Sequence, residues 1–174
     1  MHYGSAGKNL EINLSTGKSR KTEIDTTARG MYLGGRGTNT KLFWDRVPPE
    51  TDPYSADNLM VFGVGILTGT PAPGANRTIL TTLSPQTNLQ TYSSLGGFWG
   101  AELKHAGYDN LIISGKSSKP VYLWINDDKA EIRDAGHLWG KDVRQTHKII
   151  RDELKQNGVQ VLSIGQAGEN RVLA

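Results

Sequence analysis

The order in which local patterns recur along this chain constrains its fold more than any other feature. Residues 9–24 read as a β-hairpin, because alternating apolar residues lead into a Ser-Thr-Gly turn. Residues 38–47 carry a helical pattern that ends at the proline pair 48–49, since proline cannot continue a helix. Residues 58–69 form an apolar run that closes in glycine. The first unit is therefore predicted to be hairpin, helix and buried strand.

The same order returns in the C-terminal part. Residues 121–135 predict a second hairpin that turns at 126–128, and residues 141–158 predict an amphipathic helix that stops at Asn157-Gly158. Residues 159–168 are a second apolar run closing in glycine, interpreted as a strand. We therefore expect an α+β fold made of two internally duplicated hairpin–helix–strand units in a pseudo-two-fold arrangement.

The first unit continues further than the second. It is followed by a predicted strand at 77–83, a helix at 96–106 that begins with glycines, and a strand at 110–116. The second unit reaches only residues 169–174, so we expect its repeat to be incomplete at the C-terminus and to leave a sheet edge without a partner.

Arg77 is the first candidate binding residue. It follows the loop segment Pro73-Gly74-Ala75-Asn76 and opens a Thr-rich strand, a setting that suits bidentate binding of a phosphate or carboxylate. The alternative is a surface arginine that pairs weakly with an acid.

Gly96-Gly97 form the second candidate. The helix predicted after them would carry Trp99, Leu103 and Ala106 on one face, and its free N–H groups could hold a phosphate. Tight packing of the helix against the sheet explains the glycines equally well, because their spacing matches no nucleotide-binding fingerprint.

The other chemistry-bearing residues form no recognisable constellation. The loop 34–37, Gly-Gly-Arg-Gly, is interpreted as a sharp turn into a helix. The histidines His2, His105, His137 and His147 have no ligand spacing, and the acid pairs at 127–128 and 152–153 fit a turn and a helix. We therefore predict no catalytic residue in this chain.

Composition excludes several classes. The chain has no cysteine, so it cannot itself form a disulfide or ligate an iron–sulfur cluster through thiolates. Its net charge is +3 with dispersed Lys and Arg, which gives no support for nucleic-acid binding. No apolar run spans a membrane and no export signal is visible, so a cytoplasmic location is expected.

Several stretches together resemble a known family. LEINLSTG, YLGGRGTN, NLMVFGVGILTGTPAPGANRT, GGFWGAELKHAGYDNLIISGK, VYLWINDDKAEIRDAGHLWGK and SIGQAGEN are similar to the N-terminal domain of the tungsten-containing aldehyde ferredoxin oxidoreductases, over essentially all of residues 1–174. Within that family, GTNTKLFWDRVPPE, NRTI, SPQT and GENRV look closest to the tungsten subunit of the class II benzoyl-coenzyme A reductases.

The resemblance implies a base for two pterin dithiolenes that chelate one tungsten or molybdenum. On the family pattern, Arg77 falls on a pterin-contacting arginine, and Gly96, with Gly97 beside it, on a glycine that contacts pterin through its backbone. Ser94 falls where relatives carry Asn, whose backbone carbonyl helps to hold a Mg²⁺ between the pterin phosphates. Because the backbone carbonyl would bind the Mg²⁺, a serine side chain in place of asparagine at position 94 is compatible with this role.

The resemblance also implies what this chain lacks. The cysteines of the [4Fe-4S] cluster and the residues near tungsten belong to later regions, so the 174-residue chain is expected to be a truncated piece, inactive alone. Expected partners are the rest of the polypeptide or a complementary subunit and a ferredoxin-type electron carrier, in an oligomer. The alternative is a non-catalytic truncated or scaffold module that keeps the fold without metal.

Overall fold

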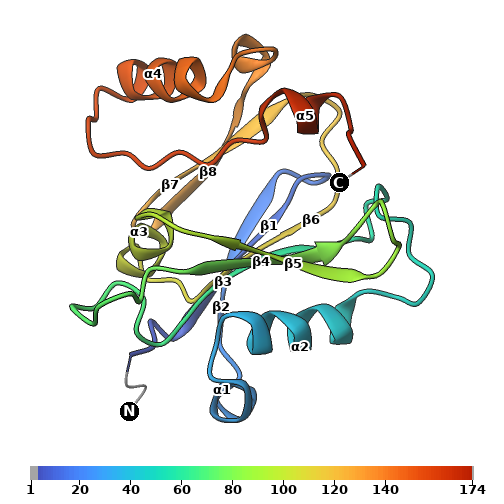
Figure 1. Ribbon diagram of the computed structural model, residues 1–174, viewed down its shortest axis with the longest axis vertical. Helices are drawn as coiled ribbons and strands as arrows, with labels where there is room; N and C mark the ends of the chain where they lie inside the picture. Colours follow the sequence, from blue (N-terminus) through green and yellow to red (C-terminus); the bar gives the residue numbers. More distant parts are fainter. Residues whose placement is uncertain (1–3, 174) are drawn as a thin grey trace.

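The computed structural model describes residues 4–173 (Figure 1). It contains a six-stranded sheet in the order β2-β1-β6-β3-β4-β5 and a separate two-stranded sheet, β7-β8. The strands are β1 (Lys8–Asn13), β2 (Lys18–Glu23), β3 (Met60–Val64), β4 (Thr78–Leu83), β5 (Gln90–Leu95), β6 (Asn110–Ser114), β7 (Val121–Asn126) and β8 (Lys129–Asp134). The helices are α1 (Thr26–Tyr32), α2 (Arg36–Arg46), α3 (Trp99–His105), α4 (Val143–Leu154) and α5 (Gly165–Glu169), with a 3₁₀ turn, η1 (Gly136–Leu138).

The large sheet is mixed. Strands β1 and β6 run parallel, while all its other neighbouring pairs are antiparallel. The β1–β2 turn follows local chemistry, because the Asn13 side chain accepts a hydrogen bond from the Thr16 N–H and Gly17 takes a positive φ of 69°. Strand β5 lies at one edge of the sheet, and Figure 1 shows it running alongside β4.

Helices α1 and α2 lie on one face of the large sheet, and α3 and the β7–β8 hairpin lie on the other (Figure 1). The core on the α3 side contains Leu10, Phe62, Leu103 and Tyr108, with Leu123 of the hairpin packed against it. The core on the α2 side is smaller. It consists of Phe43, Leu59, Val61 and Ile112. The central strands are therefore buried on both faces.

A third layer lies beyond the β7–β8 hairpin. Helix α4 packs there through Ile150 against Ala135 and Leu138. Its N-terminus is closed by a capping box, in which Asp142 accepts from the Gln145 N–H and the Gln145 side chain accepts from the Asp142 N–H. Its C-cap, Lys155, has a left-handed conformation.

Both hairpins and the helices α2, α3 and α4 confirm the sequence patterns, apart from their ends. The helix predicted from residue 96 begins only at Trp99, so Gly96-Gly97 lie in the preceding turn. Two elements carried too little pattern to be predicted. They are the seven-residue helix α1, and β5, whose sequence QTYSSL has one large aliphatic residue.

The strand predicted at residues 159–168 is wrong. Residues 159–163 form no strand, and Gly165–Glu169 form the short helix α5. An apolar run becomes a strand only if another strand bonds to it, and none within residues 4–173 does so here. The internal duplication consequently stays a prediction. The second hairpin also differs from the first, since it forms its own sheet instead of joining the large one.

Candidate anion-binding site

The fold brings Arg77 and Gly96 together at one end of β4 and β5. Thr78 pairs with Leu95 across these antiparallel strands, so the residues just outside that pair face each other. A Cβ atom built on Gly96 would lie 3.9 Å from Arg77 Nη1. A side chain longer than alanine at position 96 would therefore compete with the Arg77 guanidinium for space.

The neighbouring candidate residues are open to solvent. Arg77, Ser94, Gly96 and Gly97 are all exposed, and Ser94 pairs with Ile79 one step further along the strands. Within residues 4–173, no hydrogen bond or ion pair occupies the Arg77 guanidinium. The weak surface ion pair considered from the sequence is absent from the described residues. The Arg77 N–H groups are thus free to donate to an anion.

Gly97 is required by its backbone conformation. Its φ of 84° lies in the region that residues with a Cβ avoid, and nothing lies within 4 Å of a Cβ built there. The helix that follows has seven residues, so its dipole adds little to anion binding. The contribution of this glycine pair is a tight turn with accessible backbone rather than a helix start.

Helix α3 packs directly on the strand that follows Arg77. A Cβ on Gly100 would stand 2.0 Å from Thr78 Oγ1 and 3.3 Å from Val64 Cγ1, distances that require glycine. Trp99, Leu103 and Ala106 contribute to the core, as predicted, and the Trp99 ring centroid lies 5.3 Å from that of Phe62. The position of the turn at 96–97 is therefore set by how α3 docks.

A buried charged network lies behind α3. The Asp109 side chain is 0% exposed, and its Oδ1 accepts from Lys104 Nζ at 2.7 Å and from Arg29 Nη2 at 3.1 Å. Its Oδ2 accepts from the Ser5 hydroxyl at 2.6 Å and the Gly7 N–H at 2.8 Å. One carboxylate thus joins the N-terminal segment, α1 and α3 to the start of β6.

Burial and pairing act in opposite directions on the pKa of these groups. Burial alone would raise the pKa of Asp109, but the bonds from Lys104 and Ser5 and the charge of Arg29 hold it below its ordinary value. Burial lowers the pKa of Lys104, and the charge of Arg29 lowers it further, against the opposing effect of Asp109. The carboxylate has two cationic partners, whereas each cation shares one carboxylate.

The second Gly/Arg loop serves the turn into α2, as the sequence suggested. Gly34 and Gly35 have φ values of 108° and 55°, and a Cβ on Gly34 would lie 2.8 Å from Arg29 Nη1. The Arg36 guanidinium lies over the Tyr92 ring, 4.7 Å from its centroid. Arg36 is therefore occupied in packing α2 against β5.

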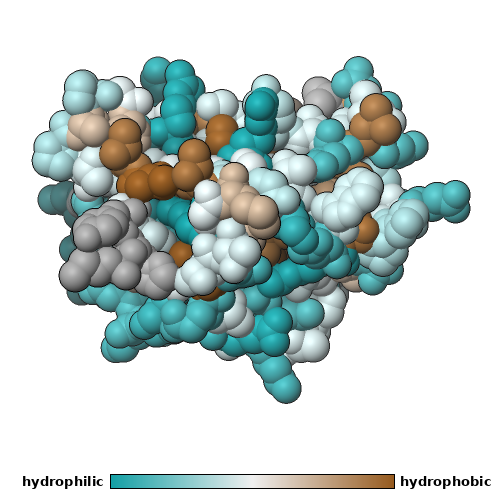
Figure 2. Space-filling model, turned by 90° about the horizontal axis from the view of Figure 1, so that it is seen from below, coloured by the Kyte–Doolittle hydropathy of each residue, from teal (hydrophilic) through white to brown (hydrophobic). Residues whose placement is uncertain are grey.

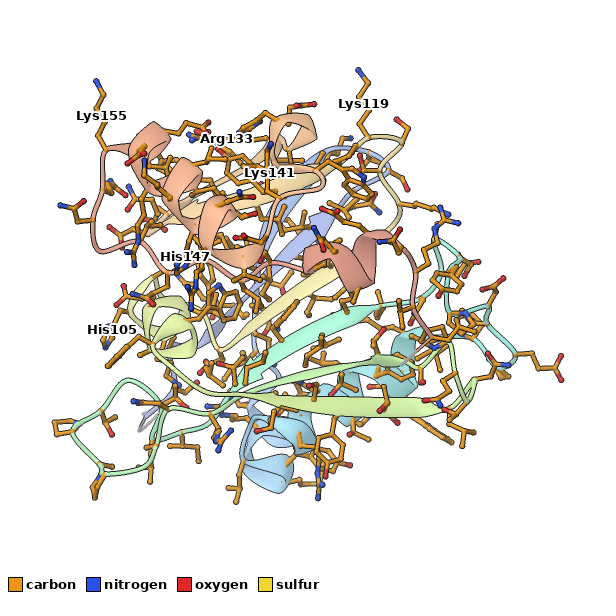
Figure 3. The ribbon with its side chains drawn as sticks, turned by 45° about the horizontal axis from the view of Figure 1, so that its top comes forward. His105, Lys119, Arg133, Lys141, His147 and Lys155 are labelled. Carbon is orange, nitrogen blue, oxygen red and sulfur yellow. The ribbon has the colours of Figure 1, made fainter. Side chains whose placement is uncertain are left out.

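The histidines make separate structural contacts. His105 Nε2 lies 3.0 Å from the Gly69 carbonyl, His147 Nε2 accepts from the Val161 N–H at 3.3 Å, and His137 Nε2 lies 3.3 Å from Glu153. Figure 3 shows His105 on α3 and His147 on α4. His2 lies outside the described residues. In the part of the chain that the structure describes, no three His, Asp or Glu side chains gather to hold a metal ion.

A surface groove lies away from these residues. It has a volume of about 1040 Å³ and is formed by the loop after α2 and the β4–β5 turn, with Trp44, Tyr54 and Leu89 among its lining residues. None of the candidate residues lines it. Figure 2, seen from the side of α1 and α2, shows a mainly hydrophilic surface with separate hydrophobic patches. Within residues 4–173, no helix is long and apolar enough to cross a membrane.

Sequence patterns did not reveal the supporting residues Asp109, Lys104, Arg29 and Thr68. None of the four is among the candidate residues of the sequence analysis, although Asp109, Lys104 and Thr68 lie within stretches that resemble the family. Apart from Lys104 and Asp109, which are near neighbours in the chain, these residues come from distant segments and meet only in the folded state, so a search of local spacing could not have found the network.

The chain is similar to known proteins over nearly its whole length. The family model described as "Aldehyde ferredoxin oxidoreductase, N-terminal domain" matches residues 9–174. The tungsten-containing aldehyde ferredoxin oxidoreductases of Pyrococcus furiosus and Thermococcus kodakarensis are each 44% identical over 170 residues, which cover 98% of this chain and 28% of theirs.

A solved structure is also similar. A chain of the active site complex BamBC of benzoyl coenzyme A reductase in complex with 1,5-dienoyl-CoA is 53% identical, with a TM-score of 0.96, over 98% of this chain and 26% of that one. This likeness, with the preceding matches, confirms the resemblance found from the sequence motifs. The present chain spans about a quarter of the length of these relatives.

Proposed function

Because this chain belongs to the aldehyde ferredoxin oxidoreductase family, we propose that it is the N-terminal cofactor-binding domain of an oxidoreductase with a bis-pterin tungsten or molybdenum cofactor. The observation that carries this proposal is the exposed Arg77 guanidinium, which faces the glycine turn 96–97 and has no hydrogen-bond or ion-pair partner within residues 4–173. The domain proposed comprises residues 1–174, and the rest of the activity depends on regions beyond it.

The residues present fit the phosphate end of a pterin cofactor. Arg77 would neutralise a phosphate through its free N–H groups, and Gly96 leaves the space that the phosphate needs beside Nη1. Gly97 allows the turn to present its backbone, and the exposed Ser94 would offer its carbonyl to a Mg²⁺ between two phosphates. These residues bind and orient the cofactor, and none of them acts on the substrate.

The bound cofactor would supply two-electron redox chemistry at its metal. Relatives are named tungsten-containing aldehyde ferredoxin oxidoreductase and, in one case, aliphatic sulfonate oxidoreductase, and the similar solved structure is the active site complex of a benzoyl coenzyme A reductase. We propose an aldehyde, a carboxylic acid or an aromatic acyl-CoA as substrate. A [4Fe-4S] cluster in a later region, a ferredoxin-type electron carrier, an oligomeric assembly and a cytoplasmic location complete the proposal.

The proposal is tested with full-length protein produced anaerobically with tungstate. Wild type is expected to retain pterin and tungsten, measured by pterin fluorescence after oxidation and by elemental mass spectrometry. Arg77→Ala is expected to lose most of both, and Arg77→Lys to lose part, because an ammonium cannot donate bidentately. Arg144→Ala, which changes an exposed arginine on α4, is the matched control and should retain wild-type content. Absence of pterin and metal from wild type would refute the proposed function and favour the non-catalytic module.

A further inference from the structure

We propose that Thr68 and Lys104 are positioning residues that hold the backbone of Arg77 in place for anion binding. This inference rests on the proposed function and extends it to residues that no cofactor would touch. Thr68 is 3% exposed and lies in the turn after β3, while Lys104 lies in the last turn of α3. Both residues lie within stretches that resemble the family, but neither is among the candidate binding residues of the sequence analysis.

The connection from Thr68 to Arg77 is direct. Thr68 Oγ1 accepts a hydrogen bond from the Gly65 N–H at 3.1 Å and donates one to the Arg77 carbonyl at 3.4 Å. A single hydroxyl therefore uses its donor and an acceptor position to join the end of β3 to the residue that opens β4. Because Arg77 is exposed and its guanidinium makes no hydrogen bond or ion pair within residues 4–173, its backbone is the part of the residue that hydrogen bonds restrain.

Lys104 also restrains the turn after β3, through the Gly65 carbonyl. Its Nζ donates to the Gly65 carbonyl at 3.3 Å and to Asp109 Oδ1 at 2.7 Å, and its side chain is only 10% exposed. Gly65 thus receives a bond on its carbonyl from Lys104 and gives one from its N–H to Thr68. The result is a continuous series of hydrogen bonds: Asp109, Lys104, Gly65, Thr68 and Arg77.

The series also links the two parts of the candidate site. Lys104 belongs to α3, which begins directly after the turn at Gly96-Gly97, and Gly100 of the same helix packs on Thr78. Lys104 therefore fixes α3 and Arg77 relative to one another. Two buried cations, Lys104 and Arg29, share the one carboxylate of Asp109, so the support behind the site carries a net positive charge that favours a bound anion.

The test compares the rate at which full-length protein variants lose pterin and tungsten after dilution into cofactor-free anaerobic buffer. Thr68→Val removes the hydroxyl with little change of shape, and Thr68→Ser retains it. Thr146→Val, in α4, is the control for replacing another buried threonine. All variants are measured at a temperature where each is fully folded by circular dichroism, so that global unfolding does not contribute.

We expect Thr68→Val and Lys104→Met to release the cofactor about tenfold faster than wild type, by analogy with the loss of affinity seen when the hydrogen-bond partner of a metal ligand is removed. Thr68→Ser and Thr146→Val should release it at the wild-type rate. Wild-type release from Thr68→Val overturns the inference while leaving the proposed function intact, and so does equally fast release from Thr146→Val. A wild-type protein that never binds pterin overturns the proposed function itself.

Discussion

Gly100→Ala is predicted to destabilise the protein, because α3 packs on β4 through the missing side chain at this position. The added Cβ would lie 2.0 Å from Thr78 Oγ1, about 1.4 Å short of ordinary contact. Thr78 is 1% exposed and β-branched, so its side chain cannot rotate away freely. The helix must therefore move away from the strand.

The size of this destabilisation results from two opposing contributions to the free energy of unfolding. Crowding of this kind in a packed interior costs about 3 kcal/mol at its upper end. Replacing glycine by alanine in a helix returns about 0.8–1 kcal/mol of backbone entropy. The expected net loss in the free energy of unfolding is about 2 kcal/mol, which corresponds to a fall in Tm of about 4–8 °C for a chain of this length.

The assay is urea unfolding followed by circular dichroism, with the slope m checked for constancy. Gly30→Ala is the matched control, because Gly30 is exposed within α1 and nothing lies within 4 Å of its built Cβ. That variant should be stabilised by about 0.5–1 kcal/mol. Glycine-to-alanine substitution should thus lower the free energy of unfolding in α3 and raise it in α1.

A double variant tests whether the Thr78 hydroxyl causes the destabilisation. Adding Thr78→Ala to Gly100→Ala removes the hydroxyl that is crowded, so the two substitutions should couple favourably by about 1–2 kcal/mol. If Gly100→Ala is as stable as wild type, or if the double variant shows no coupling, α3 does not dock on β4 as described. In that case the docking of α3 would not determine the position of the turn at 96–97 either.

Two further substitutions test the packing and the charge pairing in the interior of the protein. Gly63→Ala should cost about 3 kcal/mol in urea unfolding, because its Cβ would lie 2.0 Å from Asn39 Oδ1 and disrupt the bond that Asn110 donates to that atom. Asp109→Asn should cost about 3 kcal/mol at pH 7, because it leaves two buried cations without their carboxylate. Since the pKa of Asp109 is lowered by folding, its stabilisation is complete above its ordinary value near 3.8 and is lost as the pH falls through the lower folded-state pKa. The difference in free energy of unfolding between wild type and Asp109→Asn should therefore narrow as the pH falls below about 4, and a difference that stays constant into that acid range would contradict the assignment.

The hairpins and longer helices were predictable because their signals are local. Alternating apolar residues and a turn define 9–24, and a helical apolar pattern followed by Asn157-Gly158 predicted α4, which ends slightly earlier, at Leu154. Strand β5 was not predictable, since its exposed polar residues become a strand by bonding to β4. Residues 159–163 show the converse case, where an apolar pattern without a bonding partner remains irregular.

The candidate site was likewise predictable from the sequence only in part. The residue types at Arg77 and Gly96-Gly97 could be singled out from the sequence, because a lone arginine at a strand start and a glycine pair are visible as letters. Their approach within a few ångströms depends on the register of β4 and β5, which pairs Thr78 with Leu95. Register is a property of two strands together, so neither segment contains it alone.

By itself, the sequence determined the α+β class through local spacing and turn chemistry, and the family through the resemblance of its motifs. It also singled out the glycines and the arginine of the candidate site, because their residue types are visible along the chain. The tertiary structure alone decided that Asp109, Lys104, Thr68 and Arg77 form one connected support, since these residues meet through bonds between distant elements. It also decided that α3 rests on Thr78 through a glycine. Both facts are set by close packing in the interior, where the space left by one element determines which residue the next can carry.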